Sequence, residues 1–181
     1  MDSIAFRAAT EADIPAVIKL VTSAYRGPES RQGWTTEADI LDGPRIHPDI
    51  LAADISRPRS MVLLGERDGD GLLACAHIAA EDDACYFGMF AVRPAQQGGG
   101  AGKAILAEAE RIAREQWGLG CMRMAVIDLR ESLIAFYLRR GYARTGIHRP
   151  FPYGDERFGI PLRADLRLEL LEKTLHMEPT A

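Results

Sequence analysis

A run of glycines between Gln97 and Lys103 is the feature of this 181-residue chain best suited to chemistry. It follows an apolar, strand-like segment and opens an amphipathic, helix-like one. The first amides of a helix lack internal partners and lie at the positive end of its dipole, so they attract anions. Glycines let a diphosphate approach the backbone closely and accept left-handed turns. The turn is therefore predicted to hold a pyrophosphate; the alternative is a flexible surface linker.

Spacing excludes two common nucleotide-binding loops. A Walker loop would need glycine where Gln97 stands and a hydroxyl side chain where Ala104 stands. A dinucleotide fingerprint would need glycine in place of Lys103 or Ile105. Neither pattern is present.

The pattern that does fit is Gln-x-x-Gly-x-Gly, formed by Gln97, Gly100 and Gly102 after Val92 and Pro94. It resembles the acetyl-CoA motif of the GCN5-related N-acetyltransferase (GNAT) family, and nearly the whole chain follows that family's element order. The resemblance implies acetyl-CoA as acyl donor. The strand backbone would pair with pantetheine, and the amides of the turn would hold the pyrophosphate. The cofactor-binding residues implied are Phe90, Ala91, Val92, Gln97, Gly98, Gly99, Gly100, Ala101, Gly102 and Lys103.

A second motif resembles the family's Asn-x-x-Ala-x-x-Phe-Tyr-x-x-x-Gly-Phe. Phe136, Tyr137 and Gly141 match it, whereas Arg130 and Leu133 replace the usual Asn and Ala. By this resemblance Tyr137 is catalytic and protonates the departing CoA thiolate; the alternative is a packed helix tyrosine. A phenol of pKa about 10 donates to a thiol of pKa about 8.5 only from hydrogen-bonding distance. Arg130 is predicted to bind CoA by meeting a phosphate.

The resemblance implies direct transfer of the acetyl group to a primary amine, with a backbone amide near Phe90 stabilising the oxyanion. An ammonium acceptor must first lose a proton, and three residues on or beside central strands are weak candidates for the base. His77 is also readable as a core histidine, Glu81 as a turn residue and Asp128 as a helix cap. The sequence leaves the base unassigned.

The three cysteines, Cys75, Cys85 and Cys121, lie in predicted strands without an evident partnering base. They are expected to be core residues, which argues against a covalent cysteine route. No Cys-x-x-Cys pair is present, so no metal is expected.

The sequence constrains the identity of the acceptor amine less than that of the acyl donor. Five acids lie between residues 35 and 54, against a single arginine, Arg45: Glu37, Asp39, Asp42, Asp49 and Asp54. They suggest an acidic lip that attracts a cationic small-molecule amine, or else an ordinary acidic surface. Two other functions stay open, namely N-acetylation of proteins or peptides and a non-catalytic acyl-CoA-binding module.

The helices and strands that would position these residues follow from the hydrophobic pattern of the sequence. Apolar runs predict strands over 3–8, 61–66, 72–80, 84–92, 122–127, 142–148 and 166–174, and helical spacing predicts helices over 10–26, 36–43, 48–57, 101–117 and 132–140. This order predicts a single α/β domain over residues 1–181, with one mixed sheet and helices on both faces. The GNAT resemblance adds that the sheet is mostly antiparallel.

The composition of the chain argues against several classes of protein. A net charge of −4 and a pI of about 5.6 oppose binding to nucleic acid. No apolar run of about 18 residues and no signal peptide is visible, so we expect a cytoplasmic protein without membrane contact. By the same resemblance, we expect the chain to fall in a bacterial-type branch of the family and, by analogy with its relatives, to form a homodimer.

Overall fold

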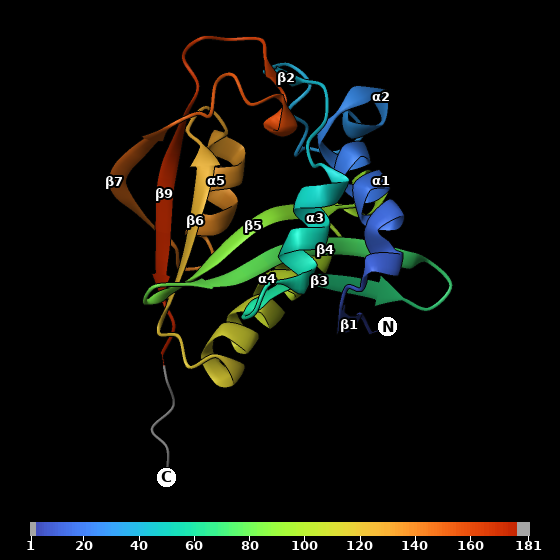
Figure 1. The fold of residues 1–181 in the computed structure, drawn as a ribbon, viewed down its shortest axis with the longest axis vertical. Coiled ribbons are helices and arrows are strands. Elements are labelled where there is room, and N and C mark those ends of the chain that lie inside the picture. Colours follow the sequence, from blue (N-terminus) through green and yellow to red (C-terminus); the bar gives the residue numbers. More distant parts are fainter. Residues whose placement is uncertain (1–2, 177–181) are drawn as a thin grey trace.

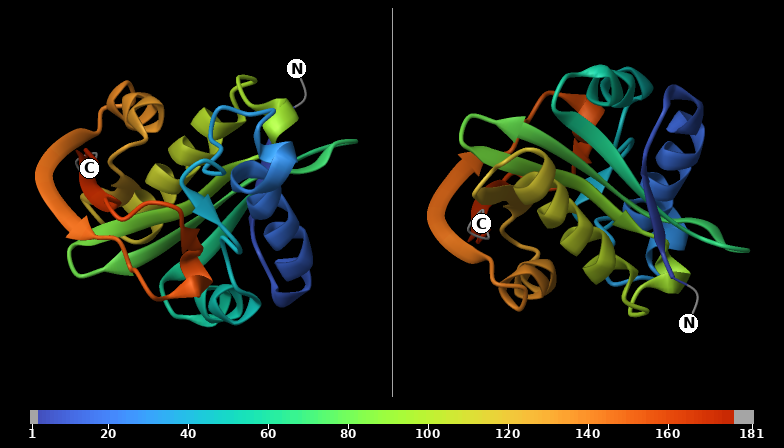
Figure 2. Two further views of the ribbon diagram at one scale, coloured as in Figure 1. Left: turned by 90° about the horizontal axis from the view of Figure 1, so that it is seen from above. Right: turned by 90° about the horizontal axis from the view of Figure 1, so that it is seen from below.

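The computed structural model describes residues 3–176 and contains a seven-stranded sheet in the order β1-β3-β4-β5-β6-β9-β7, with helices on both faces (Figures 1 and 2). Neighbouring strands are antiparallel except for the parallel pair β5 and β6. The prediction of a mixed, mostly antiparallel sheet is confirmed. The strands are β1 (Ala5–Ala8), β3 (Ser60–Arg67), β4 (Gly71–Glu81), β5 (Ala84–Val92), β6 (Cys121–Ile127), β7 (Ala143–Pro150) and β9 (Arg167–Thr174), and the main helices are α1 (Ile14–Tyr25), α3 (Pro48–Ser56), α4 (Ala101–Arg111) and α5 (Glu131–Leu138).

The alternation of side chains along the strands divides the core between the two faces. On β3, Leu63 packs into the cluster beneath α4 and α5, whereas Val62 and Leu64 pack beneath α1 and α3. Both faces of the central strands are therefore buried, as their nearly continuous apolar runs require. On one of these faces, the α4 helix continues into a π-helical turn, Ile112–Gln116.

The two predicted hairpins form because their turns contain residues that accept left-handed backbone. Gly69 and Gly71 have φ of 82° and 70° between β3 and β4, and Asp82 has φ of 51° between β4 and β5. The strands on each side pair antiparallel, as predicted.

The predicted helix over 36–43 is wrong. The chain makes one turn, in which the Leu41 amide donates to the Glu37 carbonyl at 2.9 Å, and then forms the short strand β2 (Leu41–Asp42). β2 pairs with β8 (Ile160–Pro161), so a distant partner overrides the local signal. The stretch over 27–36, expected to be a loop, begins with the four-residue helix α2 (Gly27–Ser30).

β5 and β6 separate soon after they meet (Figure 1). Within residues 3–176 they pair only at Cys85–Met122 and Tyr86–Arg123. Further along β5, a register shift against β4 coincides with a positive φ of 48° at Met89. From Phe87 onward the edge of β5 that faces β6 therefore borders an opening, while the opposite edge stays paired with β4.

Among residues 3–176, no helix combines the length and apolarity that crossing a membrane requires.

Candidate active site

A cavity of about 290 Å³, the donor cavity, lies at the N-terminus of α4. Gly98 and Gly100 have φ of 88° and 90°, which favours glycine at both positions. The first hydrogen bond of α4 runs from the Ala104 amide to the Gly100 carbonyl at 3.0 Å, and no side chain caps the helix. The amides of residues 101–103 precede that bond, so this helix end can bind an anion. The lining is Trp34, Thr35, Phe90, Val92, Gln97, Gly98, Gly100, Gly102, Lys103, Phe136, Arg139 and Arg140.

Gly102 lets α4 approach β5 closely. A Cβ atom added there would lie 3.1 Å from Phe90 Cζ and 3.4 Å from Val92 Cγ2. The amide of Gly99, by contrast, already donates to the Gln96 carbonyl at 3.3 Å. The structure thus brings the amides of residues 101–103 to the end of β5, and these amides, unlike that of Gly99, have no hydrogen bond within residues 3–176 that would compete with a bound anion.

The side chain of Gln97 is engaged by the protein. Its Nε2 donates to Thr35 Oγ1 at 2.8 Å and to the Val92 carbonyl at 3.1 Å, and its Oε1 accepts from the Trp34 amide at 2.9 Å. Gln97 therefore fastens the loop that carries Trp34 and Thr35 to the end of β5. These two residues form a wall of the donor cavity, and Gln97, which also lines the cavity, supports that wall.

The predicted pantetheine-binding backbone lies at the end of β5. The Phe90 carbonyl accepts from the Tyr25 hydroxyl, and Ala91 pairs with Cys75 in the β4–β5 ladder. The carbonyl of Val92 accepts from Gln97. Because a carbonyl oxygen has two lone pairs, pairing with pantetheine stays a prediction that these contacts allow.

A second cavity of about 270 Å³, the acceptor cavity, lies where β5 and β6 separate. Phe90 lines both cavities, so donor and acceptor spaces meet at this residue. Most of the acceptor lining is apolar. Its ionisable residues are Tyr25, Glu37, Arg45, Asp54, His77, Tyr86, Arg130 and Tyr137.

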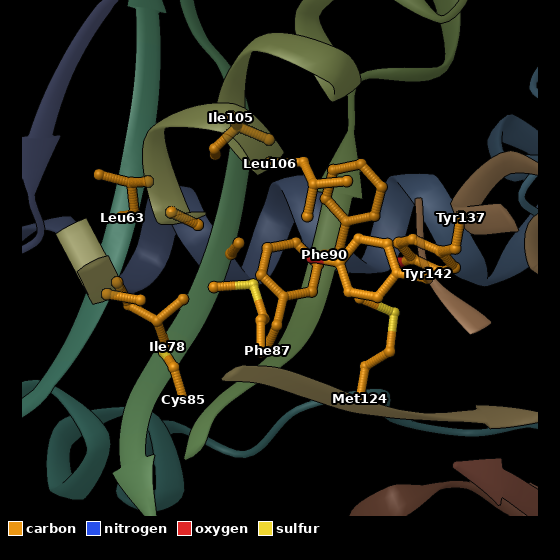
Figure 3. Packing of buried hydrophobic residues seen from close by; sticks show 14 of the residues in the cluster. Leu63, Ile78, Cys85, Phe87, Phe90, Ile105, Leu106, Met124, Tyr137 and Tyr142 are labelled. Carbon is orange, nitrogen blue, oxygen red and sulfur yellow. The ribbon is translucent and has the colours of Figure 1, made fainter. Parts of the chain in front are cut away.

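Tyr137 lies on α5 within a cluster of aromatic rings and lines the acceptor cavity (Figure 3). Its ring centre is 6.2 Å from that of Phe90 and 6.4 Å from that of Phe87. Burial raises the pKa of Tyr137 well above 10. The hydroxyl is therefore protonated at neutral pH, the state that a proton donor needs.

Arg130 points into the acceptor cavity. Its Nη1 lies 2.8 Å from Glu37 Oε1, and its Nη2 donates to the Thr35 carbonyl. It does not line the donor cavity described above. A contact between Arg130 and a CoA phosphate stays a prediction, but these partners do not favour it.

Glu37 is buried rather than part of an acidic lip. Its Oε2 lies 2.6 Å from Arg26 Nη1 and 3.6 Å from Arg45 Nε. Burial alone would raise the pKa of Glu37, but the charges of Arg130, Arg45 and Arg26 lower it, so the carboxylate is ionised. The acidic-lip hypothesis is wrong for this residue, which neutralises arginines instead.

Of the three candidate bases, only His77 lines the acceptor cavity. Glu81 is exposed beside the β4–β5 turn, and Asp128 is paired with Arg167. Burial lowers the pKa of His77 to about 4, so the ring is neutral. Its Nδ1 lies 3.6 Å from Asp54 Oδ2.

Asp54, which the sequence placed only among the acids of the proposed lip and not among the candidate bases, lines the acceptor cavity beside His77. Ser60 Oγ donates to the Asp54 carbonyl at 2.7 Å, so it is free to accept from His77 Nε2 at 2.9 Å. That arrangement leaves His77 Nδ1 unprotonated and facing the Asp54 carboxyl. No local pattern in the sequence marks this role, because the residues that surround Asp54 come together only in the folded cavity.

The cysteines lie apart from this chemistry. Burial raises the thiol pKa of both Cys75 and Cys85 to about 12, and neither lines either cavity. Thiolates are therefore scarce at neutral pH. In the described part of the chain, no group of three or more His, Cys, Asp or Glu side chains is arranged to hold a metal ion.

Comparison with known structures reveals the same fold at low sequence identity. The ribosomal-protein-S18-alanine N-acetyltransferase of Escherichia coli aligns with a TM-score of 0.70 at 17% identity, over 97% of this chain and 96% of that one. A spermidine N-acetyltransferase mutant from Vibrio cholerae gives 0.69 at 12% identity, over 96% and 94%. A Salmonella typhimurium acetyltransferase, solved with its cofactor acetyl-CoA, gives 0.67 at 16% identity, over 99% and 98%.

No curated protein matches the sequence. The profile of the Acetyltransferase (GNAT) family, however, matches residues 16–142, which is well over half of the chain and includes both predicted motifs. The chain therefore belongs to the GNAT acetyltransferase family.

Proposed function

We propose that this protein transfers an acetyl group from acetyl-CoA to the primary amine of a small molecule, in a ternary complex of both substrates. The observation that carries the proposal is the junction of two cavities at Phe90, with an uncapped helix end in one and Tyr137 in the other. The acceptor cavity, at about 270 Å³, has the size of a small-molecule site. GNAT membership supports the donor.

The donor cavity suits a diphosphate-containing cofactor. The amides of Ala101, Gly102 and Lys103 would hold the pyrophosphate of CoA, and the Lys103 ammonium would add positive charge. The wall formed by Trp34 would border the cofactor. When bound, acetyl-CoA supplies an acetyl group activated as a thioester.

Two side chains of the acceptor cavity handle protons. Asp54 takes a proton from the acceptor nitrogen, and a small approach of His77 Nδ1, now 3.6 Å from Asp54 Oδ2, would let the ring accept a hydrogen bond from the protonated carboxyl. Tyr137 gives its proton to the thiolate sulfur as the carbon–nitrogen bond forms and the carbon–sulfur bond breaks. The acceptor attacks as the neutral amine, an ammonium having first released one proton to solvent. The proton on Asp54 later returns to the Tyr137 phenolate, so the site regains its starting charge. An amide of the β5 bulge near Phe90 stabilises the oxyanion.

Release of CoA, measured with a thiol reagent across small amines and peptides, tests this function. We expect turnover with small amines and little with peptides, because the cavity is enclosed by side chains from several elements. Tyr137→Phe should lower kcat about 100-fold while the CoA dissociation constant changes less than about twofold. Tyr142→Phe is the matched control, because its hydroxyl bonds Glu110 at 3.0 Å outside both cavities. An unchanged rate in Tyr137→Phe would remove its acid role, and acetyl-CoA binding without turnover of any amine would favour a binding module.

A further inference from the structure

Arg45 faces the acceptor cavity and makes no side-chain hydrogen bond within residues 3–176. Its Nε lies 3.6 Å from Glu37 Oε2, beyond hydrogen-bonding distance, and its guanidinium carbon lies 5.1 Å from the centre of the Tyr25 ring. Only 26% of the side chain is exposed. A guanidinium that has lost most of its water and keeps free donors is well suited to bind a planar anion in a bidentate manner.

Glu37 does not satisfy this arginine. Its two oxygens already receive hydrogen bonds from Arg26 at 2.6 Å and from Arg130 at 2.8 Å. The buried cluster therefore contains three cations and one anion. In the described chain no ion pair within 4.0 Å joins Arg45 to Asp54, the other acid of the cavity. Around Glu37, three arginines therefore surround one carboxylate, and two of them, Arg45 and Arg130, line the cavity, so a bound anion at Arg45 would be neutralised.

The rest of the cavity limits what such a ligand is. Asp54 and His77 line the same space and provide a place for an amine. The remaining lining includes the apolar residues Leu41, Ile50 and Phe151. A volume of about 270 Å³ lies at the lower limit of the range of about 300–1,000 Å³ found for small-molecule pockets, which suits a ligand the size of an amino acid.

We infer that the acceptor is a primary amine that also carries a carboxylate and an apolar side chain, and that Arg45 binds the carboxylate. This inference rests on the proposed acetyl transfer and deepens it. It replaces the cationic acceptor that the acidic composition of residues 35–54 suggested. Both anions can pair with a guanidinium in a bidentate manner, and a carboxylate is preferred to a phosphate because it is smaller and its single charge matches one arginine without a hydrogen-bonded partner among the described residues.

Matched pairs of amines test the inference. Leucine is compared with 3-methylbutylamine, methionine with 3-(methylthio)propylamine and phenylalanine with 2-phenylethylamine, with phosphoethanolamine as the phosphate-bearing arm. We expect kcat/KM to be about 10- to 100-fold higher for the preferred amino acid than for its decarboxylated partner. Arg45→Met should remove most of that difference, mainly through KM, and leave the decarboxylated amine within about twofold of its wild-type rate.

Two controls separate the subsite from general damage. Arg31→Met removes an exposed arginine that pairs with Asp39 on the surface and should preserve the preference. Calorimetric binding of N-acetylleucine and N-(3-methylbutyl)acetamide to the CoA-loaded protein measures the contribution of the carboxylate without any turnover. We expect N-acetylleucine to bind about 10-fold more tightly to the wild type, and the two ligands to bind equally to Arg45→Met.

The outcomes distinguish the two proposals. Equal turnover within each pair, or an equal loss for both members in Arg45→Met, overturns the carboxylate subsite and leaves acetyl transfer intact. Preference for phosphoethanolamine overturns the choice of a carboxylate. Absence of CoA release with every amine overturns the proposed function, in which case tighter binding of N-acetylleucine that Arg45→Met abolishes still supports the subsite.

Discussion

At the scale of single residues, the acceptor cavity places an acid and a neutral histidine side by side. Burial raises the pKa of Asp54, although the charge of Arg57 opposes the shift, and burial lowers the pKa of His77 to about 4. The two shifts bring the proton affinities of the carboxyl and the ring closer together. A proton taken from an amine by Asp54 then faces the unprotonated Nδ1 of His77, which lies 3.6 Å from Asp54 Oδ2.

The proposed role of Asp54 predicts a specific pH dependence. Only the ionised carboxylate accepts a proton, so kcat/KM should fall as pH drops through a pKa above the usual value of about 3.9. Asp54→Asn should lower kcat/KM about 100-fold and abolish this acidic limb. Asp49→Asn, on the exposed side of the same helix, is the control. An acidic limb that persists in Asp54→Asn would assign the proton to another group.

At the scale of elements, the junction of β5 and α4 determines where CoA can bind. A glycine inside a helix normally costs stability, so replacement by alanine is favourable by about 0.5–1 kcal/mol when space allows. At Gly102 the added Cβ would lie 3.1 Å from Phe90 Cζ, tighter than ordinary contact. The helix N-terminus or the Phe90 ring must then move.

We therefore expect Gly102→Ala to weaken CoA binding about 10-fold, a loss of about 1.4 kcal/mol in binding free energy, as measured by calorimetry. Gly120→Ala is the matched control, because its added Cβ meets no atom within 4 Å. Equal CoA affinity in the two variants would show that α4 can shift at no cost to the anion site.

The elements also show how far the sequence predicts this structure. The glycine turn, the hairpins and the Tyr137 helix have local signals in their own residues, and each was predicted near its observed place. The prediction of a helix over 36–43 was wrong because β2 forms only by pairing with β8, which lies far along the chain. Likewise, the arginine partners of Glu37 come from three separate segments of the chain. No local sequence pattern at Arg45 or Asp54 predicts that the two residues line the same cavity.

At the scale of the whole molecule, the sheet consists of two parts joined at one end. The first contains β1, β3, β4 and β5, and the second contains β6, β9 and β7. In the described part of the chain the two parts pair directly only at two positions near the start of β5, and the acceptor cavity occupies the opening beyond them. At the open end, the chain is tied by the β2–β8 pair and by the ion pair between Glu37 and Arg130.

This arrangement makes Glu37 a structural tie as well as part of the cavity wall. Glu37→Gln leaves Arg26 and Arg130 buried with one fewer negative charge, and removing one partner of a buried ion pair typically costs about 3–5 kcal/mol. We expect a loss of about 3 kcal/mol in the free energy of unfolding, measured with urea. Asp39→Asn is the matched control on the same loop, because its exposed pair with Arg31 should contribute at most about 1 kcal/mol. Saturating CoA should recover part of the loss of unfolding free energy in Glu37→Gln, since a ligand bound only to the native state stabilises that state.

Equal destabilisation by Glu37→Gln and Asp39→Asn would contradict this role of Glu37. It would mean that the β2–β8 pair alone holds the open end, and that the buried arginines need no carboxylate to neutralise them.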